Sequence, residues 1–223
     1  TGLVGPETKL TFLGFGTMNR KDGKPFKTRE GGVMRLEYLV SGIQEEMYKK
    51  ISDNHTVDEE EGRETAKVVG LSAIKYGDLS NQASKDYMFD IERFTSFEGN
   101  TGPYILYTIV RIKSILKKYQ AQRELPPQAQ ILPAHTDSEK ALMLEISKFN
   151  GMMETAFEEK APHKVCAYIY DLANAFNHFY HETKIIGEQD EMVQAGYIKL
   201  LGLTKKALEL CIRVLGFEAP ERM

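Results

Sequence analysis

A cationic stretch near the start of the chain has the composition of a phosphate-handling loop. Residues 21–32 contain four lysines or arginines, three glycines, one proline and one aromatic residue. Lys24 and Lys27 are three residues apart, so on a flexible loop both can reach one polyphosphate and oppose the charge that builds up as pyrophosphate leaves. A solvated surface turn has the same composition, because lysine, glycine and proline are ordinary turn residues.

The glycines nearby do not form a known nucleotide-binding motif. Gly14 and Gly16 lack the third glycine of the dinucleotide fingerprint, and the spacing from Gly16 to Gly23 is wrong for a Walker A loop. Residues 24–28, Lys-Pro-Phe-Lys-Thr, instead align with the Lys-Met-Ser-Lys-Ser signature of class I aminoacyl-tRNA synthetases. The two lysines and the final hydroxyl, that of Thr28, are retained.

A second candidate site lies between Gly99 and Arg123, where no acidic residue occurs. Five basic residues alternate there with three tyrosines: Arg111, Lys113, Lys117, Lys118 and Arg123, with Tyr104, Tyr107 and Tyr119. Basic side chains neutralise phosphates and aromatic rings stack on unstacked bases, so the pattern predicts a helix face for an RNA backbone. A solvated helix whose tyrosines are half-buried in a helical core has the same pattern.

The elements that position these residues are predicted to be mostly helices. Residues 8–18 are a strand-like apolar run that leads into the cationic loop. Apolar residues then recur at helical spacing from Val33 to Ile51, and residues 56–59 form a capping-box pattern. Further helices are expected after Pro103 to about Gln122, from about Ser138 to Glu159, from Pro162, and from about Asp190 to Leu215. Prolines make residues 122–136 a surface connection.

The helix that begins at Pro162 is the most informative of these. One face carries an unbroken apolar stripe of Val165, Ile169, Leu172, Phe176 and Phe179, and the other carries Tyr170, Asn174, Asn177 and His181. Tyr180 lies off the stripe beside Asn177 and His181. It is therefore a better candidate than either phenylalanine for touching a base.

Charge, hydropathy and cysteine content exclude several classes of protein. The net charge of −3 argues against a general nucleic-acid binder, so no DNA partner is expected. No apolar run is long enough to cross a bilayer, so no membrane partner is expected either. Cys166 and Cys211 lie among apolar neighbours, which predicts reduced core thiols and a cytoplasmic location. His163 and Cys166 alone do not make a metal site, and none is expected.

Three segments of the chain resemble arginyl-tRNA synthetases. The first runs from Ala73 to Arg111 and includes Phe97-Glu98-Gly99-Asn100-Thr101-Gly102-Pro103-Tyr104, the second is residues 176–181, and the third is the chain end, residues 215–223. Leu106 departs from the family pattern, which often has glutamine there. The resemblance covers nearly all 223 residues. The chain lacks the His-x-Gly-His-type motif and most of the nucleotide-binding sheet that complete family members carry upstream. We therefore expect it to be a fragment that has no aminoacylation activity by itself.

The resemblance implies a fold and an activity. Residues 1–52 would be the end of a class I Rossmann-type catalytic domain, and residues 53–223 an α-helical anticodon-binding domain of the DALR type. The activity would be ATP-dependent attachment of arginine to tRNA(Arg), with ATP as substrate, Mg²⁺ in the full-length enzyme, and no cofactor bound by this fragment. A free-standing tRNA-binding module, a helical protein-interaction domain and another synthetase of the subclass are the alternatives.

The resemblance also implies roles for individual residues. Lys24 and Lys27 would contact the ATP phosphates during catalysis, and Thr28 would help to hold the closed form of their loop. Tyr107, Tyr180 and Met223 would contact the anticodon loop. Arg111 would bind an RNA phosphate beside them.

Overall fold

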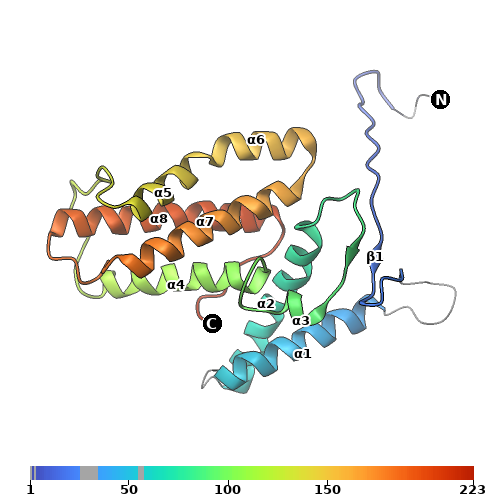
Figure 1. Ribbon diagram of the computed structural model, residues 1–223, viewed down its shortest axis with the longest axis horizontal. Coiled ribbons are helices and arrows are strands. Elements are labelled where there is room, and N and C mark those ends of the chain that lie inside the picture. Colours follow the sequence, from blue (N-terminus) through green and yellow to red (C-terminus); the bar gives the residue numbers. More distant parts are fainter. Residues whose placement is uncertain (1, 3, 26–34, 55–57) are drawn as a thin grey trace.

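The computed structural model describes residues 2, 4–25, 35–54 and 58–223, which form helices and one small sheet (Figure 1). The helices are α1 Leu36–Asn54, α2 Glu59–Leu79, α3 Ile91–Phe94, α4 Gly102–Gln120, α5 Asp137–Ser147, α6 Phe149–Glu159, α7 Pro162–Glu182 and α8 Glu191–Val214. The strands are β1 Met18–Asn19 and β2 Tyr87–Met88. The mostly helical fold class predicted from the sequence is confirmed.

The two short strands attach the start of the chain to the helices. They pair in parallel, with Met18 opposite Tyr87 and Asn19 opposite Met88. Beside them, the Asp86 carboxylate accepts hydrogen bonds of 2.7 Å from the backbone N–H and the hydroxyl of Thr17. These contacts fix residues 16–19 against the segment between α2 and α3.

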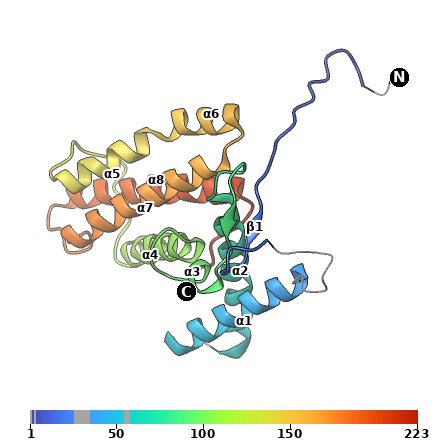
Figure 2. The same cartoon turned by 45° about the vertical axis from the view of Figure 1, so that its right-hand side comes forward.

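The strand predicted for residues 8–18 is wrong for most of its length. Residues 8–17, all of them described, adopt no regular element and extend away from the helices (Figure 2). Leu10, Phe12 and Phe15 are 80%, 93% and 89% exposed. A strand requires a neighbour that accepts and donates its ladder hydrogen bonds, and β2 supplies one only at Met18 and Asn19.

Side-chain caps set the starts of the helices near the positions that the sequence indicates. Thr101 accepts a hydrogen bond from the Tyr104 N–H at the start of α4, and Asp190 accepts two from the first turn of α8. The cap of α2 is Asp58, which accepts from the Glu61 N–H. Thr56 of the predicted capping box lies outside the described residues.

The single helix predicted for residues 138–159 is two helices. The Lys148 N–H bonds to the carbonyls of Glu145 and Ile146 instead of continuing the regular ladder, and α6 begins at the next residue. Phe157, predicted on the apolar side, is 84% exposed, whereas Ala156 is buried. Sequence periodicity missed the break because the apolar spacing continues through it.

The centre of the core is α7, as its stripe predicts. All five stripe residues, from Val165 to Phe179, are at most 3% exposed, and α7 packs against α4, α5, α6 and α8 (Figure 1). Cys166 and Cys211 are free and buried nearby, which confirms the predicted core thiols. Burial raises the pKa of both to about 12, so they stay protonated and unreactive at neutral pH.

Gly102 is expected to tolerate no side chain. A Cβ at this position would lie 2.4 Å from the Ser72 carbonyl oxygen, so α2 and α4 would have to move apart. We expect Gly102→Ala to lower the free energy of unfolding by at least about 1 kcal/mol, as overpacking usually does. Urea denaturation measures this change.

Gly151 supplies the matched control for this prediction. It lies inside α6, and a Cβ there would meet no described atom within 4 Å, so Gly151→Ala should leave stability unchanged or raise it. Equal unfolding midpoints for Gly102→Ala and the unsubstituted protein would contradict the close approach of α2 and α4.

Candidate nucleic-acid interface

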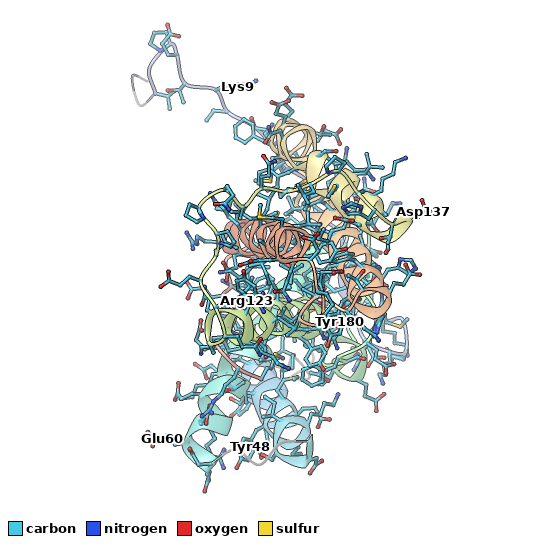
Figure 3. The ribbon with its side chains drawn as sticks, turned by 90° about the vertical axis from the view of Figure 1, so that its left-hand side faces the viewer. Lys9, Tyr48, Glu60, Arg123, Asp137 and Tyr180 are labelled. Atoms are coloured by element: carbon cyan, nitrogen blue, oxygen red, sulfur yellow. The ribbon has the colours of Figure 1, made fainter. Side chains whose placement is uncertain are left out.

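An arginine held between two tyrosines forms the centre of the candidate site. The Arg111 guanidinium carbon lies 4.7 Å from the ring centroid of Tyr107 and 5.1 Å from that of Tyr180. Tyr107 and Arg111 are one turn apart on α4, as their spacing predicts. Tyr180, labelled in Figure 3, comes from the neighbouring α7. The three side chains form a cationic surface with two aromatic faces.

A chain of hydrogen bonds fixes the orientation of this arginine. Arg111 Nη1 donates to Asn177 Oδ1 at 2.7 Å, and Asn177 Nδ2 donates to the Tyr104 hydroxyl at 2.9 Å. That hydroxyl in turn donates to Asn174 Oδ1 at 2.7 Å. Because each group positions the next, the guanidinium is held in place before any ligand binds.

Arg111 lines a hollow of about 670 Å³ that residues from four parts of the chain enclose. Its lining is mixed polar and apolar: Lys50, Ile51, Phe97, Glu98, Tyr104, Tyr107, Arg111, Asn177, His181 and Met223. Tyr107 and Tyr180 are 38% and 37% exposed, so part of each ring is accessible. A hollow of this size with aromatic and cationic walls can hold an unstacked base next to its phosphate.

The structure thus brings the four predicted RNA-binding residues together. Tyr107, Arg111 and Met223 line the same hollow, and Tyr180 contacts Arg111 at its edge. Lys50 and Ile51, near the end of α1, also line the hollow, and the sequence did not predict them there. No local pattern could indicate this, because α1 and α4 are far apart in the sequence.

The basic and aromatic residues of α4 do not share one face, contrary to the prediction. Two residues along a helix turn by roughly 200°, so Lys113 points away from Arg111. Lys113 Nζ is instead 2.7 Å from Glu221 and 3.8 Å from Glu209. Tyr119 is buried, with 2% of its surface exposed.

The cationic loop near the start of the chain is described only in part. Lys24 is exposed, and its N–H donates to Asp22 Oδ1 at 3.1 Å. Lys27 and Thr28 lie outside the described residues. Lys21 Nζ lies 3.1 Å from Glu92 and 3.2 Å from Asp90, and these hydrogen bonds raise its pKa. Lys21 therefore attaches the base of the loop to α3, a role distinct from phosphate binding.

Over the described ranges, no three histidine, cysteine or acidic side chains group so that they could hold a metal ion. None of the described helices is long and apolar enough to span a bilayer.

Comparison with protein families identifies the chain. Residues 105–223, more than half of it, match the DALR anticodon binding domain, and residues 2–91 match the catalytic domain of class I (R) tRNA synthetases. The chain belongs to the arginyl-tRNA synthetase family. The resemblance read from the sequence is confirmed. Five of the ten residues that line the hollow, Arg111 among them, lie in the part matched to an anticodon-binding domain.

Individual members of the arginyl-tRNA synthetase family extend this result. The arginine–tRNA ligase of Agathobacter rectalis is 62% identical over 231 residues, covering 100% of this chain and 39% of its own length. That of Alkaliphilus oremlandii is 54% identical, covering 100% and 38%. The chain thus spans about two fifths of the length of these curated relatives.

Solved structures agree with the family assignment. The arginyl-tRNA synthetase of Thermus thermophilus superposes with a TM-score of 0.82 at 25% identity, over 95% of this chain and 35% of that one. The enzyme from Plasmodium falciparum superposes with a TM-score of 0.71 at 26% identity, over 85% and 34%.

Proposed function

We propose that the chain is the C-terminal part of an arginine–tRNA ligase that recognises tRNA(Arg). In this proposal, residues 53–223 bind the anticodon region and residues 1–52 complete the catalytic domain with the cationic loop. The observation that carries it is the Arg111 guanidinium held between Tyr107 and Tyr180, three residues of the segment matched to an anticodon-binding domain.

Each residue at the hollow has a physical role in this proposal. Arg111 neutralises a phosphate of the anticodon loop, and its planar guanidinium matches the phosphate oxygens. Tyr107 and Tyr180 offer accessible ring faces on which unstacked bases lie. Met223 supplies a flexible apolar contact at the edge of the same hollow.

The catalytic role belongs to the cationic loop. The arginine carboxylate attacks the α-phosphate of ATP, which forms arginyl-adenylate as pyrophosphate leaves. A ribose hydroxyl of the tRNA then attacks the arginyl carbonyl carbon, and AMP leaves. Lys24 and Lys27 stabilise the leaving pyrophosphate, and Thr28 holds the loop closed. Mg²⁺ would enter with ATP, because it is usually bound through substrate phosphates together with one or two carboxylates.

The compartment that we propose is the cytoplasm, where the translation machinery uses charged tRNA. Two free, buried cysteines support it, because small extracellular proteins more often join such residues in disulfides.

Replacement of Arg111 tests RNA binding by this chain. We expect Arg111→Ala to weaken binding of a tRNA(Arg) anticodon stem-loop and to reduce the slope of log affinity against log salt by about one unit, because one phosphate contact is lost. Titrations at several salt concentrations measure both quantities.

Lys199→Ala is the control for charge, since Lys199 is an exposed residue of α8 that does not line the hollow. It should leave the slope nearly unchanged. A wild-type slope and affinity for Arg111→Ala would place the phosphate contact elsewhere, and the absence of RNA binding by the unsubstituted chain would favour a protein-interaction domain.

A further inference from the structure

The last nine residues run from the end of α8 along α2 and α4 (Figures 1 and 2). Gly216 makes the turn with a φ of +83°, and its carbonyl accepts a hydrogen bond from Lys75 of α2. Phe217 is buried next, with its ring edge-on to Tyr76 at a centroid distance of 6.5 Å. The first part of this chain end is therefore packed into the core.

The middle of the chain end is bound by one lysine of α4. Lys113 Nζ donates to the carbonyls of Ala219 at 3.3 Å and Pro220 at 3.2 Å, and to Glu221 Oε1 at 2.7 Å. Its side chain is only 14% exposed, and Glu209 of α8 lies 3.8 Å away on another side. An ammonium group surrounded by these acceptors has little capacity left for an RNA phosphate.

The next residue makes a second ion pair. Arg222 donates through Nε and Nη2 to the two carboxylate oxygens of Glu61 on α2, which is the bidentate geometry that fixes both partners in orientation. Met223 follows directly and lines the hollow with Tyr107 and Arg111. Two ion pairs thus precede the one terminal side chain that reaches the candidate RNA site.

We propose that these two ion pairs, Lys113 with Glu221 and Arg222 with Glu61, form a tail latch that positions Met223 for RNA binding. Lys113 is then a positioning residue and not a phosphate ligand. Holding the tail before binding removes the entropy cost of ordering it when the RNA arrives. The inference rests on the proposed RNA-binding function.

The charge state of the latch supports this role. The hydrogen bond and the charge of Lys113 lower the pKa of Glu221 below its ordinary value, with smaller contributions from Lys117 and Lys205. Glu221 therefore remains a carboxylate at neutral pH. The stabilisation of the chain end by its ion pair with Lys113 is lost only as the pH falls through the lowered pKa of Glu221.

Substitution of Glu221 distinguishes positioning of Met223 from direct phosphate binding by Lys113. If Lys113 bound a phosphate, removal of the neighbouring acid would make the surface more positive and strengthen RNA binding. If the latch positions Met223, the same removal weakens binding although the net charge becomes more favourable. The two accounts predict opposite signs for one substitution.

The test compares the full chain with Glu221→Gln, using a tRNA(Arg) anticodon stem-loop and the ¹³C-methyl NMR signal of Met223. We expect Glu221→Gln to weaken binding about two- to fivefold, the size typical of a partly exposed ion pair. The Met223 signal should narrow and move toward its value in an unfolded chain. Adding Lys113→Met to Glu221→Gln should weaken binding further, because the hydrogen bonds from Lys113 to the carbonyls of Ala219 and Pro220 are then lost as well.

Glu218→Gln is the matched control, because it removes the same charge from the same segment at an exposed residue outside both ion pairs. It should leave the Met223 signal unchanged and should not weaken binding. Unchanged or tighter RNA binding by Glu221→Gln, or an unmoved Met223 signal, would overturn the latch. If the unsubstituted chain binds no RNA, the proposed function fails, and the Met223 signal alone still decides whether the latch exists.

Discussion

Lys27→Ala is expected to slow formation of arginyl-adenylate about a hundredfold or more, because a preorganised charge opposing the leaving pyrophosphate is lost. The substitution should leave tRNA affinity nearly unchanged, since the loop is far in sequence from the anticodon-binding segment. The measurement is single-turnover kinetics on a chimera that joins this chain to the upstream part of the Agathobacter rectalis relative, which is 62% identical.

Lys85→Ala provides the control for loss of a positive charge near the loop. Lys85 is an exposed lysine just before β2, in the segment to which the start of the chain is attached. Its replacement should leave the rate nearly unchanged. An unchanged rate for Lys27→Ala as well would mean that the cationic stretch is a surface turn and that its match to the synthetase signature is fortuitous.

Tyr107→Ala is expected to weaken binding of the anticodon stem-loop by about 1 to 3 kcal/mol, the range measured for losing one base stack. This corresponds to a change in Kd of about five- to 150-fold. The salt slope should stay nearly constant because no charge is removed, which separates this variant from Arg111→Ala. Tyr180→Ala and removal of Met223 should each weaken binding in the same way.

Tyr107→Phe and Tyr38→Ala are the controls for this ring. The first keeps the stacking face, and the second removes an exposed tyrosine of α1 that does not line the hollow. Both should bind nearly as the unsubstituted chain does. Wild-type binding by Tyr107→Ala, Tyr180→Ala and the chain without Met223 would mean that these residues serve packing alone.

Parts of the fold follow from short-range rules and could be predicted. The stripe on α7 recurs at helical spacing and is buried throughout, and Asp190 caps α8 at the predicted position. The break at Lys148 was not predictable, because the apolar periodicity passes through it without change. The strand predicted for residues 8–18 failed because strand formation depends on a partner that local sequence does not specify.

The candidate site likewise contains contacts that the sequence predicts and contacts that it does not. Tyr107 and Arg111 are one helical turn apart, so their contact follows from spacing alone. The contribution of α1 to the hollow and the pairing of Lys113 with Glu221 depend on how distant segments pack. The run of basic residues along α4 therefore grouped Lys113 with the RNA-binding residues. In the structure Lys113 lies on the opposite side of the helix from Arg111 and binds Glu221 of the chain end.

The most direct test of the central claim is the affinity of this chain for the anticodon stem-loop of tRNA(Arg), measured beside a stem-loop whose anticodon loop comes from another tRNA. We expect the arginine stem-loop to bind about tenfold more tightly, roughly the value of one hydrogen bond to a base edge, because stacking alone tolerates any base. Arg111→Ala combined with Tyr107→Ala should abolish the difference. Equal affinity for the two stem-loops, or a preference that survives both substitutions, would contradict recognition of the anticodon loop at this hollow.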